Sequence, residues 1–382
     1  MGMDKHLHIS CVSSGFGGLE INTLKQAEWL TEYGWQVHLL LLDGSKMHEA
    51  AGKFSKNITT VPKGSFMRWR KVVYMRRWIN INDQSPIIFT ALNKDIATAS
   101  LYKRLYKPKA IVIYQQQMKV GVKKKSPIHK LRYEKVDAWI SPLPYLIEET
   151  LEKTTITRDK IKLIPLSIDA KPFFENPETK SSARHNLNLP QDVKLIGVLG
   201  RIDPEKGQDF LIRCIRMLKE KYHADYHLTI MGNITPEHGE EYMNSLHTLA
   251  ESLGVKDRVY FLPFSWDVKQ FYRAIDVFAM ASRGEHFGMV TVEAMASGCP
   301  VIGTNKDGTK ELLEDGKLGY LFEYNNEIDF CEKLQQLELN KEITFMLENA
   351  KKAVYDKYSK ESMCKQMDEL FISLANKRNR VV

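Results

Sequence analysis

Short apolar segments alternate with segments of helical periodicity along the whole chain of 382 residues. Strands buried on both faces of a parallel sheet read as continuous apolar runs, whereas the covering helices repeat apolar residues every three or four positions. In the first half we expect a helix over residues 20–33 and strands over residues 6–12, 36–42, 110–114 and 138–141. In the second half we expect strands over residues 194–200, 226–231, 258–262, 277–280 and 300–303, each followed by a helical pattern. The sequence therefore predicts an α/β fold with two Rossmann-like, doubly wound domains.

A polar stretch separates the two series of strands. Residues 169–182 contain Pro172 and Pro177 and show no apolar period, so we expect a linker there. This leaves an N-terminal domain over residues 1–168 and a C-terminal domain over residues 183–358, each of ordinary size. The composition, 43% hydrophobic and 27% charged, is typical of a globular protein.

Two features of the sequence bear on the compartment. No apolar run approaches the roughly 20 residues needed to cross a bilayer, and the N-terminus leads directly into the first predicted strand, so we expect a cytoplasmic protein. The cysteines are odd in number, far apart and without C-x-x-C pairs, which favours buried thiols over disulfides or a metal site. They are Cys11, Cys214, Cys299, Cys331 and Cys364.

The helix predicted over residues 288–297 is apolar on nearly every side, yet Glu293 lies in its middle. A helix that is apolar all round belongs in the interior of a protein. A buried carboxylate is strongly unfavourable there unless it is paired or hydrogen-bonded. Glu293 is therefore expected to face a polar ligand or a cation.

The loop before this helix carries a second carboxylate. Residues 282–288 follow a short apolar strand and contain Glu285. The backbone N–H groups of Phe287, Gly288 and Met289 would be free at the helix N-terminus, where anions such as phosphate bind favourably. One acid before the helix start and one after it are suited to binding hydroxyl groups.

Glu285 and Glu293, with seven residues between them, resemble the E-x7-E motif of retaining glycosyltransferases of the GT-B fold, in particular glycosyltransferase family 4. Gly200-Arg-Ile-Asp-Pro-Glu-Lys-Gly207 is similar to the Gly-Arg-x-x-x-x-Lys-Gly loop of that family. Gly15-Phe-Gly-Gly-Leu-Glu20 resembles its Gly-Gly-x-Glu loop. Residues 300–304, 307–311 and 319–322 match its downstream pattern. The resemblance covers the C-terminal half throughout and mainly the beginning of the N-terminal half.

This resemblance implies a GT-B architecture, in which two Rossmann-like domains face each other across a cleft. It also implies that the last helix, about residues 359–382, packs back on the first domain. Glu293 would hold the ribose hydroxyls of a nucleotide-diphosphate sugar, and Glu285 the hydroxyls of the donor sugar. A diphosphate oxygen would help to deprotonate the acceptor, so that retaining transfer needs no side-chain base. For Glu285, a carboxylate that only caps the following helix is the alternative interpretation.

Two cations follow the first strand of the second half. Ligands of open parallel sheets bind beyond the carboxyl ends of the strands, where Arg201 and Lys206 are expected to offset the charge of a leaving diphosphate. Ordinary solvated loop charges are the alternative, which the position at a strand end and the resemblance disfavour. The chain contains no D-x-D sequence and no His or Cys cluster with ligand spacing, so we expect neither a metal nor another cofactor.

Two polar segments of the first half have open interpretations. The loop around Gly17 and Gly18 lacks the full spacing of a dinucleotide fingerprint, and a tight turn into the helix explains it as well as phosphate contact does; the resemblance favours donor binding. Many family members carry a His after a strand near the reacting sugar, where this chain has Tyr114-Gln-Gln-Gln117. Gln115 and Gln116 are therefore catalytic candidates that can bind a hydroxyl but cannot titrate. A plain polar cluster at a strand end explains them equally well.

Positive charge concentrates in one part of the N-terminal half. Residues 51–150 contain 20 lysines and arginines against 6 acidic residues, a net charge of +14, whereas the whole chain carries +8. Residues 66–78 mix aromatic and basic side chains at near-helical spacing, and residues 119–132 carry six further positive charges. Such surfaces bind anionic headgroups, so we expect contact with an anionic membrane surface on the inner face of the cytoplasmic membrane. A solvated helix face whose aromatic residues pack into the core is the alternative.

The same charge has a bearing on the acceptor. A phosphorylated lipopolysaccharide core or a phospholipid-linked sugar would explain it, so we expect a glycan or lipid-linked acceptor in cell-envelope polysaccharide or lipopolysaccharide synthesis. Nucleic acid is not expected as a partner, because no recognition motif accompanies the basic residues. UDP is the favoured nucleotide, although no motif separates it from GDP or ADP.

Other functions share this fold. An NAD-dependent oxidoreductase would show a full G-x-G-x-x-G and an acidic residue about 20 positions further on, which the first loop lacks. A catalytically silent protein that binds a membrane surface would not need Arg201, Lys206, Glu285 and Glu293. Epimerases and phosphorylases also use the GT-B architecture, and a fold alone does not decide function. The E-x7-E loop and its flanks favour glycosyl transfer.

Overall fold

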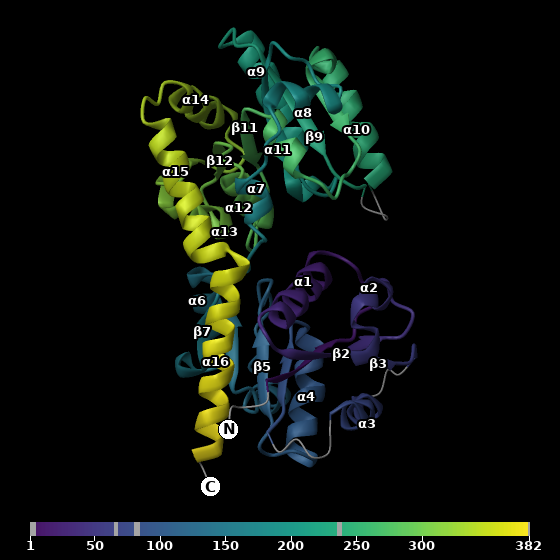
Figure 1. Ribbon diagram of the computed structural model, residues 1–382. Helices are drawn as coiled ribbons and strands as arrows, with labels where there is room; N and C mark the ends of the chain where they lie inside the picture. Colours follow the sequence, from purple (N-terminus) through teal and green to yellow (C-terminus); the bar gives the residue numbers. More distant parts are fainter. Residues whose placement is uncertain (1–4, 65–67, 80–84, 235–238, 381–382) are drawn as a thin grey trace. The chain divides into compact units, whose positions relative to one another are not determined.

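The computed structural model describes residues 5–64, 68–79, 85–234 and 239–380. The chain divides into two compact units, unit 1 with residues 1–166 and 360–382 and unit 2 with residues 167–359. Each unit contains a parallel sheet with helices on both faces (Figure 1). The predicted α/β fold with two Rossmann-like, doubly wound domains is confirmed.

Within the described residues, the sheet of unit 1 has seven strands in the order β3-β2-β1-β4-β5-β6-β7. They are β1 His6–Cys11, β2 Gln36–Leu42, β3 Ile58–Val61, β4 Ile87–Thr90, β5 Ile111–Gln115, β6 Ala138–Ser141 and β7 Ile161–Leu163. The four strands predicted for this half are confirmed as β1, β2, β5 and β6. The other three strands, β3, β4 and β7, were not predicted.

The helices of unit 1 cover both faces of its sheet. They are α1 Gly18–Glu32, α2 Lys46–Ala50, α3 Arg68–Trp78, α4 Asn93–Leu105, α5 Pro127–Tyr133, α6 Pro144–Lys153 and α16 Lys360–Arg380. Helices α1, α2 and α16 contribute to one apolar cluster, and α3, α4 and α5 contribute to the cluster on the opposite face. Both clusters are built from alternate residues of the same strands, as expected for a sheet buried on two sides.

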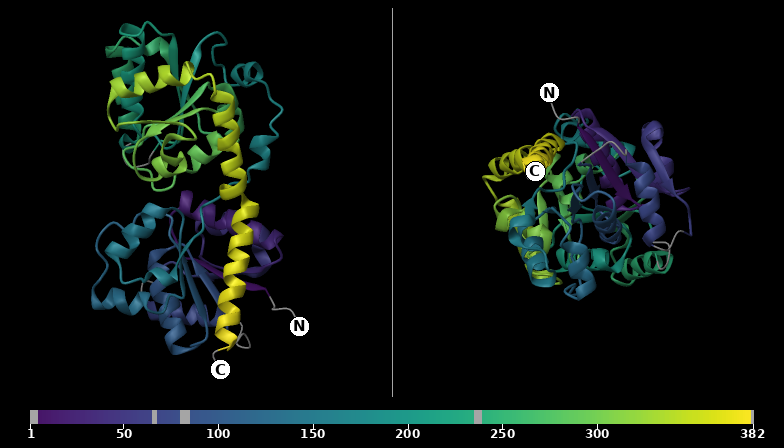
Figure 2. Two further views of the ribbon diagram at one scale, coloured as in Figure 1. Left: turned by 90° about the vertical axis from the view of Figure 1, so that its left-hand side faces the viewer. Right: turned by 90° about the horizontal axis from the view of Figure 1, so that it is seen from below.

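Helix α16 joins unit 1 although it lies at the other end of the sequence. Met363, Met367 and Phe371 are fully buried in the cluster that contains the inner residues of β1. The Phe371 ring meets the Trp35 ring edge-on with centroids 5.1 Å apart. The Trp35 indole N–H donates to the Asp368 carboxylate over 3.0 Å. Figure 2 shows this long helix running beside the sheet of unit 1.

The basic aromatic segment predicted over residues 66–78 corresponds in part to α3. Phe66 and Met67 lie outside the described residues. Val72, Met75 and Trp78 are buried in the core of unit 1. The apolar residues described on this helix therefore serve mainly to pack it, as the alternative interpretation of the segment stated.

In the described part of unit 2, six strands form a sheet in the order β10-β9-β8-β11-β12-β13. They are β8 Lys194–Leu199, β9 Tyr226–Met231, β10 Val259–Leu262, β11 Val277–Met280, β12 Val301–Thr304 and β13 Tyr320–Phe322. The helices are α7 Lys171–Phe174, α8 Lys180–Asn186, α9 Gln208–Glu220, α10 Gly239–Ser252, α11 Lys269–Ala274, α12 Met289–Ala296, α13 Asp307–Leu312, α14 Glu327–Glu338 and α15 Ile343–Ala353. The five strands predicted for this half are confirmed as β8 to β12. All strands are parallel, so the loops that follow them meet at one edge of the sheet.

The stretch 169–182, predicted as a linker, contains α7 and the beginning of α8. Pro172 lies in the first turn of α7, where a missing N–H costs no helical hydrogen bond. The Thr179 hydroxyl caps α8 by accepting from the Ser182 N–H over 3.2 Å. Pro172 and Thr179, which also fit a linker, therefore start helices here. All five cysteines are buried and free, as predicted.

Candidate functional site

Two loops meet at the carboxyl edge of the sheet in unit 2. Residues 200–207 follow β8 and residues 281–288 follow β11, and these two strands are neighbours. Gly207 has φ +73° and lies so close to the second loop that a Cβ there would come within 2.4 Å of the Ala281 carbonyl oxygen. The Arg283 N–H donates to the Glu205 carbonyl over 2.8 Å. The backbone therefore holds the loops in direct contact.

This contact brings Lys206 to Glu285. The Lys206 Nζ lies 2.8 Å from Glu285 Oε2, and the two side chains are 25% and 16% exposed. Both atoms are thus largely screened from water but accessible from the edge of the sheet. Lys206 was expected to offset the charge of a diphosphate, and the resemblance implied that Glu285 binds the hydroxyls of the donor sugar. The structure places these two charged groups next to each other.

Arg201 lies in the same loop but has a different environment. Its side chain is exposed, and no carboxylate pairs with it among the residues that the structure describes. Its carbonyl oxygen accepts a hydrogen bond of 2.8 Å from the buried Gln208 amide, which fixes the backbone of the loop. The guanidinium group is therefore available to an anion while its backbone is held in place.

The helix after the second loop, α12, begins directly after a glycine in the left-handed region. Gly288 has φ +98° and precedes α12, whose first turn leaves the N–H groups of Gly288 and Met289 without an acceptor in the described part of the chain. Phe287 is 3% exposed and anchors the loop in the core of unit 2. Gly308 donates its N–H to the Glu285 carbonyl over 3.0 Å, and a Cβ there would lie 2.7 Å from the Phe287 carbonyl oxygen. These contacts fix the loop at the N-terminus of α12, an end of a helix that favours anions.

Glu293 lies half-buried on α12 and meets a tyrosine. The Tyr272 hydroxyl is 3.0 Å from Glu293 Oε2 and 3.0 Å from the Val290 carbonyl oxygen. Burial, and then the negative charge of Glu293, raise the pKa of Tyr272 well above its ordinary value. Tyr272 therefore remains a protonated donor that fixes one oxygen of the carboxylate. The sequence predicted a polar partner for Glu293 but gave no signal for Tyr272.

In unit 1, the loop after β1 is organised by Glu20. This carboxylate accepts from the Ser13 hydroxyl over 2.7 Å and from the Gly17 N–H over 2.9 Å. The N–H of Gly17, a predicted donor-binding group, is therefore already paired. Gly18 begins α1, is exposed, and has open space where a Cβ would lie. Its N–H is the better placed of the two for a ligand.

The three glutamines after β5 differ in their hydrogen bonds. The Gln116 carbonyl oxygen accepts from Trp139, Ser141 and Thr150 over 2.9 to 3.3 Å, and its amide donates to the Met118 carbonyl. These contacts give Gln116 a structural task.

Gln115 lies on the opposite side of the strand from Gln116. Its Oε1 accepts from Gln117 over 3.4 Å, and the Gln117 Oε1 accepts from Asn22 over 3.4 Å. The Gln115 Nε2 is buried without a partner among the described residues. Of the two predicted catalytic glutamines, Gln115 is therefore the one with hydrogen-bonding capacity to spare.

A buried carboxylate that the sequence analysis missed supports the same edge of unit 1. Asp95 is 1% exposed and accepts from the Val12 N–H over 2.9 Å and from the Ser10 hydroxyl over 3.1 Å. Burial raises the pKa of Asp95. The available signal was a charged residue directly before the apolar residues Ile96 and Ala97, in the segment that forms α4.

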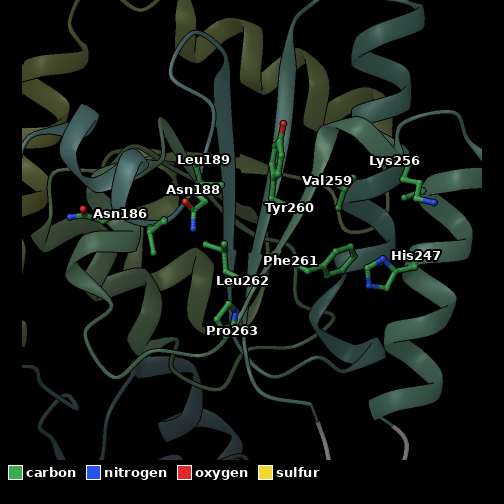
Figure 3. A pocket seen from close by; sticks show the side chains of 12 residues that line it. Asn186, Asn188, Leu189, His247, Lys256, Val259, Tyr260, Phe261, Leu262 and Pro263 are labelled. Carbon is green, nitrogen blue, oxygen red and sulfur yellow. The ribbon is translucent and has the colours of Figure 1, made fainter.

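A cavity of about 640 Å³ lies elsewhere in unit 2, at the outer edge of β10, the terminal strand of the sheet. Figure 3 shows side chains of β10 lining it together with His247 of α10 and residues that follow α8. None of the predicted site residues lines this cavity.

Within the described residues, no group of three or more His, Cys, Asp or Glu side chains is arranged to hold a metal ion.

The sequence of unit 2 matches a known family. Residues 179–359 match the family model described as Glycosyl transferases group 1. A D-inositol 3-phosphate glycosyltransferase from Stackebrandtia nassauensis is 33% identical over 184 residues, which are 47% of this chain and 41% of that protein. The chain thus matches less than half the length of this relative. Residues 179–359, which match the family model, contain the loops after β8 and β11.

Two solved structures resemble the whole chain. A glycosyltransferase from Rickettsia africae ESF-5 has a TM-score of 0.84 at 18% identity and covers 97% of this chain and 98% of its own. HepE from Anabaena in complex with UDP has a TM-score of 0.82 at 19% identity, with coverages of 97% and 100%. At these identities the likeness establishes the fold, which is GT-B. Together with the matched domain, it supports a glycosyltransferase of the GT-B fold.

The contact between the two loops can be tested by adding a single methyl group. Gly207→Ala introduces a Cβ that clashes with the Ala281 carbonyl, whereas Gly254→Ala has a similar φ of +65° but open space around the Cβ. Gly254→Ala should lower the free energy of unfolding by about 1 kcal/mol, and Gly207→Ala by roughly 1–3 kcal/mol more. Urea unfolding of both variants measures the difference. Equal losses would contradict the close approach of the loops.

The different tasks of Gln116 and Gln115 can also be separated. Gln116→Leu removes the acceptor of three buried donors and should lower the free energy of unfolding by about 3 kcal/mol or more. Gln115→Leu removes an amide whose N–H is unpaired, so its loss should stay within about 1 kcal/mol. Urea unfolding followed by tryptophan fluorescence, to which Trp139 contributes, measures both losses. The reverse order of losses would refute these assignments.

Proposed function

We propose that the protein is a retaining glycosyltransferase of family 4 that moves a hexose from a UDP-sugar to a hydroxyl group of a glycan or lipid-linked acceptor, without a metal ion. The observation that carries this proposal is the pairing of Lys206 with Glu285 beside the start of α12, with Glu293 in the same helix. A cation and free N–H groups can bind the diphosphate of a nucleotide sugar, and two carboxylates can bind its hydroxyl groups.

The diphosphate would bind at the start of α12. The Arg201 guanidinium, the Lys206 ammonium and the N–H groups of Gly288 and Met289 supply positive charge and donors on one side of it. As the anion binds, it would compete with Glu285 for Lys206 and release that carboxylate toward the hydroxyls of the donor sugar. UDP is supported as the nucleotide by the UDP complex of the structurally similar Anabaena protein.

The ribose would bind to Glu293. Tyr272 fixes one oxygen of this carboxylate over 3.0 Å, which holds the side chain in one orientation for its ligand. A carboxylate accepts hydrogen bonds from two neighbouring hydroxyls, the arrangement that a ribose offers. This use accounts for the charged residue in an otherwise apolar helix.

Transfer would break the bond between the anomeric carbon and the diphosphate oxygen and form a bond from the acceptor oxygen to the same face of the sugar. The acceptor proton would pass to the departing diphosphate oxygen, so no side chain has to titrate. Arg201 and Lys206 would stabilise the negative charge that develops on the leaving group. The product should keep the anomeric configuration of the donor, read from the coupling constant of the anomeric proton by NMR. An inverted configuration would contradict this step.

Unit 1 would supply polar groups for the transfer. The Gly18 N–H at the start of α1 is open to an anion, and the buried Gln115 amide keeps an unpaired N–H that can bind a hydroxyl. We keep Gln115 in preference to Gln116 for this task. The basic character of unit 1 supports an anionic acceptor, such as a phosphorylated glycan or a phospholipid-linked sugar of the cell envelope, used at a membrane surface.

Nucleotide binding tests the proposed donor site. Calorimetric titration with UDP, GDP, ADP and NAD should show selective binding of UDP that is unchanged by EDTA. Lys206→Ala and Glu293→Ala should each weaken UDP binding by about tenfold or more, since each removes a charged hydrogen bond worth on the order of 1.5–3 kcal/mol.

A matched ion pair on the same unit provides the control. Lys256 and Glu251 pair over 3.1 Å on the surface of unit 2, so Lys256→Ala and Glu251→Ala change the same charges away from the site. These variants should bind UDP normally. Normal binding by Lys206→Ala and Glu293→Ala would refute the site, and binding of NAD alone would point to an oxidoreductase.

A further inference from the structure

Residues 118–133 of unit 1 form a surface with two unusual properties, which we term the α5 surface because it contains the loop before α5 and the helix itself. The segment carries six basic residues and no acidic residue. The basic residues are Lys119, Lys123, Lys124, Lys125, Lys130 and Arg132. The neighbouring acids are committed elsewhere, because Glu134 pairs with Arg104 and Asp137 pairs with Lys103 and Arg378. Glu149 pairs with Lys153. Among the residues that the structure describes, Lys123, Lys125 and Lys130 form no ion pair, so their positive charge is not neutralised by the chain itself.

The second property is the exposure of large aliphatic side chains between these cations. Val122 is 74% exposed, Ile128 61%, Met118 55% and Leu131 53%. Ile128 and Leu131 are three positions apart in α5 and share its outer face. Single exposed aliphatic residues are ordinary, but a group of them within one basic segment is typical of an interaction surface.

The loop holds these side chains outward by specific contacts. The Glu149 carboxylate of α6 accepts from the Val120 N–H over 2.9 Å, and the Lys124 N–H donates to the Lys153 carbonyl over 2.7 Å. Val120 is buried and Gly121 has φ +73°, so the chain turns there and directs Val122 away from the core. The exposure of Val122 is thus a consequence of how the loop is tied to α6.

We propose that the α5 surface docks unit 1 on an anionic lipid bilayer. Lysines near such a surface each contribute about 1 kcal/mol through the negative lipids, and aliphatic side chains enter the boundary between headgroups and acyl chains. A soluble polyanion would match the charge but would leave the aliphatic side chains in water. No helix in the described ranges has the length and hydropathy to cross a membrane.

The other basic segment does not share these properties. In α3, Val72 and Met75 are turned into the core, and Val73 is 37% exposed. The Arg76 guanidinium lies over the Tyr106 ring, 5.0 Å from its centroid, rather than beside exposed aliphatic residues. The proposal therefore rests on the α5 surface alone.

This inference deepens the membrane part of the proposed function, and its test uses lipids without any donor. The full chain is sedimented with vesicles of phosphatidylcholine and with vesicles that also contain phosphatidylglycerol. We expect binding only to the second kind, with a partition coefficient that falls as salt is added. Absence of binding to the anionic vesicles would overturn the proposal.

Two double variants separate charge from insertion. Lys123→Gln with Lys125→Gln, and Val122→Ser with Ile128→Ser, should each lower partitioning by about tenfold or more. Leu339→Ser in unit 2, where the side chain is 80% exposed, is the matched control and should not change it. If the aliphatic variant binds like the wild type, charge alone accounts for the binding, and the proposed docking through the aliphatic side chains is refuted. UDP binding should be normal in every variant, so that failure of the membrane proposal and failure of the donor site are distinguishable.

Discussion

The close approach of the loops after β8 and β11 is the constraint on which the site of unit 2 depends. Gly207 is in the left-handed region and has no room for a Cβ beside the Ala281 carbonyl, so the loops touch through their backbones. Lys206 precedes this contact and Glu285 follows it, which places their charged groups 2.8 Å apart. The ion pair keeps two charged side chains at the start of α12 in the absence of a ligand. A diphosphate can then replace one partner of the pair without the site having to assemble.

Glu293 shows how one position serves both stability and function. An apolar helix tolerates this carboxylate because Tyr272, which is buried and remains protonated, donates to one of its oxygens. The same hydrogen bond fixes the orientation of the side chain before a ligand arrives. Glu20 and Asp95 act similarly in unit 1, where buried carboxylates accept backbone N–H groups and shape the loop after β1. In both units, acidic residues organise the loops at the carboxyl edge of the sheet.

Much of the fold could be predicted from the sequence, because parallel strands buried on both faces are continuous apolar runs. The strands β3, β4, β7 and β13 were not predicted; β3 is half threonine and β7 contains a lysine, so neither is a continuous apolar run. The short helices within the predicted linker 169–182 were not foreseen, because Pro172 and Thr179 start helices as readily as they mark loops. For the site, spacing indicated Glu285 and Glu293, but it could not indicate Tyr272, which reaches Glu293 from another helix. Spacing also could not distinguish the roles of Gln115 and Gln116. The hydrogen-bond partners of Gln116, Trp139 and Thr150, are distant from it in sequence.

The most direct test of the account is a crystal structure of the full chain with a UDP-sugar or UDP bound. We expect the diphosphate at the N-terminus of α12 within reach of Arg201 and Lys206, the ribose hydroxyls on Glu293, and Glu285 released from Lys206. The Tyr272 hydroxyl should still contact Glu293. UDP bound in the cavity at the outer edge of β10, or a diphosphate that leaves the Lys206–Glu285 pair intact, would contradict it.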